Sequence, residues 1–129
     1  MSVTTARPQG ASAAIWWWEV RRIPFNLALL VVGGASLFGI IAVGEHVAPP
    51  GYDIVDRTAI WLGTFFYALT ANFIYTLGWV SELLWSNGDT SLTEHQRPKV
   101  FYLGFALSIA ITAIPGLVML CLWSLANVK

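Results

Sequence analysis

Three long runs of apolar residues, separated by short polar segments, make up most of this chain. About 20 consecutive apolar residues let a helix cross the ~30 Å hydrocarbon core of a bilayer, because each helical residue rises about 1.5 Å. The short segments between the runs favour antiparallel packing of consecutive helices. The pattern therefore predicts an all-α membrane protein whose three transmembrane helices form an antiparallel bundle, with approximate bounds 25–46, 54–85 and 98–126.

A short aromatic and basic segment precedes the first apolar run. It contains three consecutive tryptophans and two consecutive arginines: Trp16, Trp17, Trp18, Arg21 and Arg22. Indole rings and arginines gather at the headgroup boundary of a membrane. The proline that follows, Pro24, favours the end of a helix there. The segment 13–23 is accordingly predicted to be a short interfacial helix that anchors the protein to membrane lipid.

The distribution of basic residues predicts the orientation of the chain. Five of them precede the first span or lie between the second and third: Arg7, Arg21, Arg22, Arg97 and Lys99. Only Arg57 and Lys129 fall on the other side. Because basic residues are enriched in cytoplasmic segments, we expect a cytoplasmic N-terminus and an external C-terminus in a cell inner membrane. Residues 1–12 then form a flexible cytoplasmic tail, and residues 13–129 form a single multi-pass membrane domain.

Small residues recur at helical spacing on the first and third predicted spans. They are Ala35 and Gly39 on the first, and Gly104, Ser108, Thr112 and Gly116 on the third. Small side chains let helix backbones approach closely, which is a main source of helix association in lipid. We interpret both stripes as packing seams. Packing of one span on another within the chain is the favoured use, and contact between two copies is the alternative.

The second span differs from the other two because it carries a polar face. A helical projection gathers polar side chains on one side of it: Thr64, Asn72, Tyr75, Thr76 and Glu82. Unpaired polar groups are costly against hydrocarbon, so this face is expected to point toward protein or water. Asn72 is expected to hydrogen-bond a neighbouring helix, or to line a polar pocket or pathway. Glu82 is expected to pair with Arg97 or Lys99, or to relay protons.

Composition and motifs exclude several functions. The chain is 57% hydrophobic with a formal net charge of zero, so bulk attraction to nucleic acid is not expected. Cys121 is the single cysteine, which excludes an internal disulfide. His46 and His95 fall on opposite sides of the predicted membrane and cannot share a metal or haem. Phosphate-loop, zinc-protease and serine-elbow motifs are absent. No catalytic residue, metal site or cofactor is predicted.

These patterns favour a small membrane protein without enzymatic activity that acts as a subunit or partner in a membrane assembly. Its expected partners are membrane lipid and either further copies of the chain or another membrane protein. The alternative is a channel or transporter subunit with a polar pathway along the second span. A third hypothesis is an enzyme acting on lipid headgroups through Glu82, Glu94 and His95.

Overall fold

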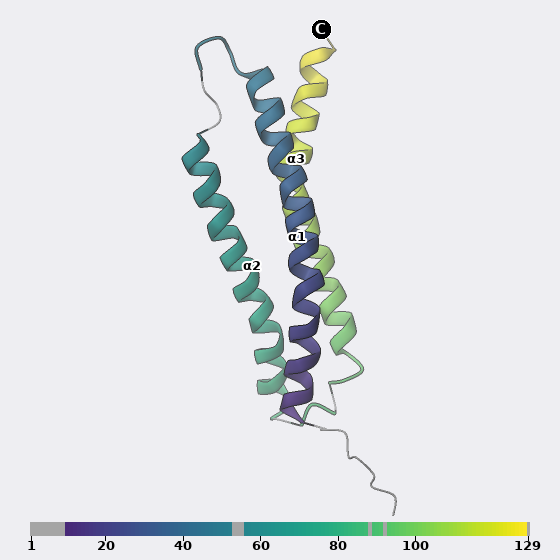
Figure 1. Ribbon diagram of the computed structural model, residues 1–129. Helices are drawn as coiled ribbons and strands as arrows, with labels where there is room; N and C mark the ends of the chain where they lie inside the picture. Colours follow the sequence, from purple (N-terminus) through teal and green to yellow (C-terminus); the bar gives the residue numbers. More distant parts are fainter. Residues whose placement is uncertain (1–9, 53–55, 88, 92, 129) are drawn as a thin grey trace, which may run out of the picture.

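The computed structural model describes residues 10–52, 56–87, 89–91 and 93–128, and it is all-α within them (Figure 1). It contains three long helices: α1 (Ala11–Val47), α2 (Arg57–Trp85) and α3 (Arg97–Asn127). Each is long and apolar enough to span a membrane. The expectation of three spanning helices is confirmed to this extent, and the bounds of α2 and α3 lie close to those predicted. Most of the predicted tail, residues 1–9, lies outside the described part of the chain.

The prediction of a separate interfacial helix at 13–23 is wrong. That segment is the beginning of α1, which continues through Pro24 without a break. Proline removes one helical hydrogen bond and costs about 3 kcal/mol in a helix interior. Here the buried residues before and after it, Trp18 and Phe25, lie on one continuous face of α1. Burial of that face against the other two helices outweighs the local cost of the proline.

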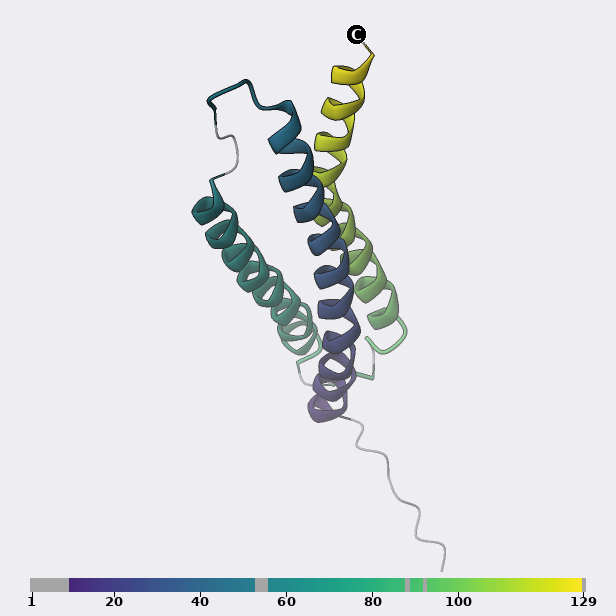
Figure 2. The same ribbon diagram turned by 45° about the horizontal axis from the view of Figure 1, so that its top comes forward.

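The three helices are not equally close to one another. Helices α1 and α3 lie side by side over most of their length, whereas α2 approaches them at one end and diverges toward the other (Figures 1 and 2). The close end contains the beginning of α1, the end of α2 and the beginning of α3. We call it the Glu82 end. At the opposite end Asp56 caps α2, because its carboxylate accepts hydrogen bonds from the backbone N–H groups of Thr58 and Ala59.

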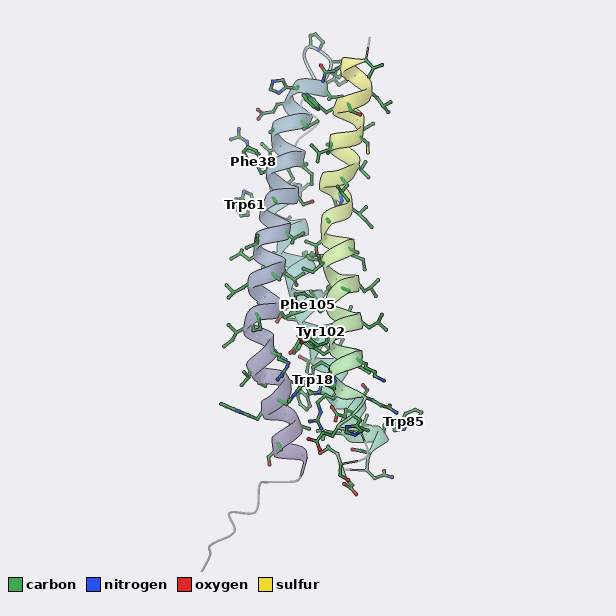
Figure 3. All side chains as sticks on the ribbon, turned by 90° about the vertical axis from the view of Figure 1, so that its right-hand side faces the viewer. Trp18, Phe38, Trp61, Trp85, Tyr102 and Phe105 are labelled. Carbon is green, nitrogen blue, oxygen red and sulfur yellow. The ribbon has the colours of Figure 1, made fainter. Side chains whose placement is uncertain are left out.

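An aromatic core holds the Glu82 end together. It is formed by buried residues from all three helices: Trp18, Phe25, Leu29, Tyr75 and Phe101. The Tyr75 ring packs 4.8 Å from Phe25 and 5.6 Å from Trp18, measured between ring centroids, and its pairing with Trp18 is edge-to-face. Trp18 points into the bundle and Trp85 points away from it (Figure 3). The core therefore lies where α2 joins the α1–α3 pair.

The α1–α3 contact includes a close approach of backbone to backbone at Gly116. A Cβ atom added to Gly116 would lie 2.8 Å from Ser36 Cα, a distance that real side chains do not tolerate. The backbone N–H of Gly116 donates a 2.8 Å hydrogen bond to Ser36 Oγ. Glycine at position 116 thus lets the two helices meet and also supplies a polar contact across the seam.

Candidate functional site

The buried carboxylate of Glu82 is the centre of the largest polar cluster in the described residues. It accepts hydrogen bonds from Trp18 Nε1 at 2.7 Å, from Thr93 Oγ1 at 2.7 Å and from Arg97 Nε at 2.8 Å. Arg97 Nη2 lies 2.7 Å from the same carboxylate, and both side chains are only 7% exposed. This cluster links all three helices with no remaining acceptor open on Glu82, so the arrangement is that of a satisfied structural ion pair.

From this cluster a ladder of polar contacts runs along the α1–α2 contact. On α1 its members follow at intervals of four residues, from Trp18 through Arg22 to Asn26. Arg22 Nη2 donates to Thr76 Oγ1 at 2.9 Å. The amides of Asn26 and Asn72 donate to each other at 3.1 and 2.9 Å. Because α1 and α2 run antiparallel, residue numbers increase along α1 as they decrease along the facing side of α2.

Among the described residues of α2, Tyr67 is the one farthest from the Glu82 end that forms a hydrogen bond to another helix. Its hydroxyl contacts Thr112 Oγ1 on α3, which in turn donates to the backbone oxygen of Ser108 at 2.6 Å. Beyond this point α2 diverges. Thr64, one turn farther along, is exposed.

Two donor atoms in the α1–α2 contact are buried without a hydrogen-bond partner among the described residues. They are Arg22 Nε and Trp79 Nε1. The rest of the Arg22 guanidinium is well placed: it contacts Glu19 at 2.9 Å and lies 5.1 Å from the centroid of the Tyr75 ring. Arg22 therefore keeps one buried donor without an acceptor among the described residues, which is costly in or beside a membrane span.

The structure places the predicted polar face of α2 in two different settings. Asn72, Tyr75, Thr76 and Glu82 contact α1, whereas Thr64 does not. Tyr75 is buried, and its hydroxyl donates to the backbone oxygen of Trp18. Four of the five residues are therefore brought together, and they are used in contacts between helices.

The predicted seam residues are also divided. Thr112 and Gly116 are buried, and Ser108 is half-buried. A Cβ atom added to Gly39 would lie 3.9 Å from Gly116 Cα, so Gly39 also faces this seam. Ala35 and Gly104 are exposed. On α1 it is Ser36, one residue beyond Ala35, that makes the close contact with α3.

The predicted anchor residues surround α1 near its beginning. Trp18 is buried, Trp17 is half-buried and Trp16 is 72% exposed. Arg21 and Arg22 are both half-buried, and they leave α1 on different sides, with Arg21 over Trp17 and Arg22 over Tyr75.

Sequence reasoning missed Asn26, Ser36 and Thr93. Asn26 interrupts an otherwise apolar run, and that signal could have identified it as a partner for Asn72. Ser36 lies among several small residues of α1, and nothing in the sequence separates it from them. Thr93 lies in the loop before α3, where sequence gives no sign that its hydroxyl meets Glu82.

The three residues of the headgroup-enzyme hypothesis, Glu82, Glu94 and His95, lie in different settings. Glu94 and His95 are exposed, while Glu82 is buried and bound by Arg97. No group of three His, Cys, Asp or Glu residues that could hold a metal is found within the described ranges. His46 lies near the end of α1, and its Nδ1 donates a 2.9 Å hydrogen bond to the backbone oxygen of Ala42.

The fold and this polar contact define a small helical bundle with three candidate transmembrane helices, which indicates a multi-pass membrane protein. Comparisons with protein-family models, with curated proteins and with solved structures find no match to this chain.

Proposed function

We propose that this protein is a non-enzymatic subunit of a membrane assembly, in which a helix from another chain packs beside the diverging half of α2. The observation that carries this proposal is the one-ended attachment of α2. From Arg57 to Phe66, every residue except the half-buried Ile60 is exposed. A helix in a complete bundle is normally contacted by its neighbours along its whole length.

The surfaces near this diverging half are suited to a close helix contact. Gly34 on α1 and Gly63 on α2 have open space where a side chain would stand. Small residues of this kind let a partner helix approach closely enough for dispersion contacts to accumulate. The exposed hydroxyl-bearing Thr64 lies one residue beyond Gly63 and offers a polar contact to the same partner. Further copies of the chain and a different membrane protein both satisfy this description.

Cysteine crosslinking in native membranes tests the proposal. A Cys121→Ser background removes the single native thiol, and Thr64→Cys then places one thiol on the diverging half of α2. We expect a crosslinked band, at twice 14.2 kDa for a second copy or at another mass for a different partner. The matched control is Leu103→Cys on α3, at a position where the leucine is 74% exposed.

The proposal fails if Thr64→Cys gives no band above the control and the detergent-solubilised particle has the mass of a single chain. Bands of equal strength from both positions also contradict it, because they indicate random collision in the membrane.

A second candidate function is a polar pathway. It is favoured by the ladder from Glu82 to Asn72 and by two buried donors beside it, Arg22 Nε and Trp79 Nε1, that have no partner among the described residues. The test is ion or solute flux in liposomes with the double variant Asn26→Leu and Asn72→Leu. Replacing both partners removes the polar pair without leaving one unsatisfied, so the bundle should remain folded. Flux that is lost in this folded variant supports a pathway, and wild-type protein without flux excludes it under those conditions.

A further inference from the structure

Among the described arginines at the Glu82 end, Arg21 differs from Arg22 and Arg97 because it forms no ion pair with another described residue. Arg22 pairs with Glu19, and Arg97 pairs with Glu82. Arg21 forms no such pair among the described residues; its Nη1 makes one long hydrogen bond, 3.3 Å, to the backbone oxygen of Trp17. A guanidinium has five N–H donors. Most of the donors on Arg21 therefore have no acceptor among the described residues and can bind another group.

The Trp17 ring holds the Arg21 guanidinium in a defined place. Arg21 Cζ lies 3.7 Å from the centroid of that ring, within the range of a strong cation–π contact. The indole itself is fixed by edge-to-face packing on Trp18 at 5.4 Å and on Phe101 at 5.8 Å. The Arg97 guanidinium lies 5.7 Å from the same ring. Arg21 is thus oriented before any ligand arrives, which lowers the entropic cost of binding.

The depth of Arg21 along α1 matches the level of lipid phosphates. The stretch from Ile23 to Gly44 carries no charged residue. At about 1.5 Å per residue it spans roughly 33 Å, close to the thickness of the hydrocarbon core. The residues just before it, Arg21 among them, then lie at the boundary where phosphate groups are found. The cluster of tryptophans at the same level agrees with this depth.

We propose that Arg21, supported by Trp17, binds the phosphate of an anionic phospholipid at the α1–α3 side of the bundle. A planar guanidinium matches two phosphate oxygens with two parallel N–H donors. Anionic lipids concentrate near basic groups at the membrane surface, so the charge of Arg21 favours them over zwitterionic lipids. This site is independent of the proposed assembly, since it lies at the Glu82 end and the diverging half of α2 lies at the other.

Native mass spectrometry of the detergent-solubilised full chain tests this site. The probes are phosphatidylglycerol and phosphatidylcholine added at equal concentration. We expect preferential retention of phosphatidylglycerol by the wild type. In Arg21→Gln that affinity should fall about fivefold, the size expected for one basic contact to an anionic headgroup.

Lys99→Gln is the matched control, because it removes one positive charge at the same end of the bundle. Lys99 is exposed, and no aromatic contact to it is found in the described residues. It should keep the preference for phosphatidylglycerol. Trp17→Leu should weaken binding while leaving the charge of Arg21 in place. Equal losses in Arg21→Gln and Lys99→Gln would overturn the proposal, because they indicate attraction by net charge alone.

A second measurement shows whether the site binds a lipid or a soluble phosphate, and whether Arg21→Gln changes binding or folding. Thermal unfolding is followed by circular dichroism in detergent, with phosphatidylglycerol or with inorganic phosphate. Phosphatidylglycerol should raise the Tm of the wild type more than that of Arg21→Gln, while the two proteins unfold at similar temperatures without lipid. An equal effect of inorganic phosphate contradicts a lipid site, and so does an equal rise in both proteins.

Discussion

Arg97 Nη2 lies 2.7 Å from Glu82 Oε1 in a pair whose two side chains are each 7% exposed. The pair joins the end of α2 to the beginning of α3, and Trp18 extends it to α1. Removing one partner of a buried ion pair is strongly destabilising, because the remaining charge is left buried without compensation.

Glu82→Gln and Arg97→Gln are each expected to lower the free energy of unfolding by about 3–5 kcal/mol. The double variant Glu82→Gln with Arg97→Gln is expected to lose less than the two single changes together, because it leaves neither charge unpaired. Unfolding by SDS in mixed micelles, followed by circular dichroism, measures all of these variants. Strict additivity would show that the two residues do not depend on each other.

The contact between Gly116 and Ser36 gives a second prediction. Gly116→Ala puts a methyl group 2.8 Å from Ser36 Cα, so the α1–α3 seam must open or the helices must shift. We expect a loss of about 1–3 kcal/mol, typical of overpacking. Gly104→Ala is the control on the same helix, since it has open space around the added methyl group. It should be neutral or slightly stabilising because alanine favours helix. Similar losses in both variants would contradict the seam.

The reciprocal Asn26–Asn72 amide pair gives a third prediction, on the coupling between α1 and α2. Asn26→Leu or Asn72→Leu leaves one amide facing an apolar side chain, and each is expected to cost about 1–2 kcal/mol. The double leucine variant should recover much of that loss, because neither side then carries an unsatisfied group. A double-mutant cycle from the same SDS unfolding measurement gives the coupling between the two residues. A coupling near zero would mean that the two amides do not pair in the membrane.

The sequence predicts the helices themselves better than it predicts the contacts between them. The bounds of α2 and α3 follow from run length and hydropathy, which are properties of each segment alone. The continuity of α1 through Pro24 does not, because it depends on Trp18 and Phe25 being buried against other helices. Similarly, the polarity of Asn72 is visible in the sequence, but its partner depends on the relative height of α1 and α2. That register is set by tertiary packing.

The turn before α3 predicts a local dependence on pH. Ser91 donates to the Asp89 carboxylate from its hydroxyl at 2.6 Å and from its backbone N–H at 3.2 Å. These hydrogen bonds favour the ionised form and hold the pKa of Asp89 below its ordinary value. The stabilisation of this turn by the Asp89 carboxylate is therefore fully present at a pH above the ordinary pKa of aspartate. It is lost as the pH falls through the lower pKa of Asp89 in the folded chain.

An NMR titration of the Ser91 amide measures this effect. The resonance should shift with a midpoint below the ordinary pKa of about 3.9 for an aspartate. Asp89→Asn should abolish the titration while leaving the helices unchanged, because the carboxylate is fully exposed. A midpoint at or above the ordinary value would show that the turn does not favour the ionised group.

The distribution of basic residues predicts how the chain is oriented in the membrane. If basic residues determine it, the Glu82 end lies in the cytoplasm, because Arg21, Arg22, Arg97 and Lys99 are all at that end. A reporter enzyme that is active only outside the cytoplasm should then be active when fused after Lys129. The same enzyme should be inactive when fused before Met1.

Ion pairs within the protein do not change this expectation, since orientation follows the number of basic residues rather than net charge. Changing Arg7, Arg21 and Lys99 to glutamine leaves Arg22 and Arg97 on one side, against Arg57 and Lys129 on the other. Loss of the bias should give a mixture of both orientations, seen as partial reporter activity at each terminus. A triple variant that keeps one orientation would show that a feature other than charge, such as the paired Glu82 end, determines how the chain inserts.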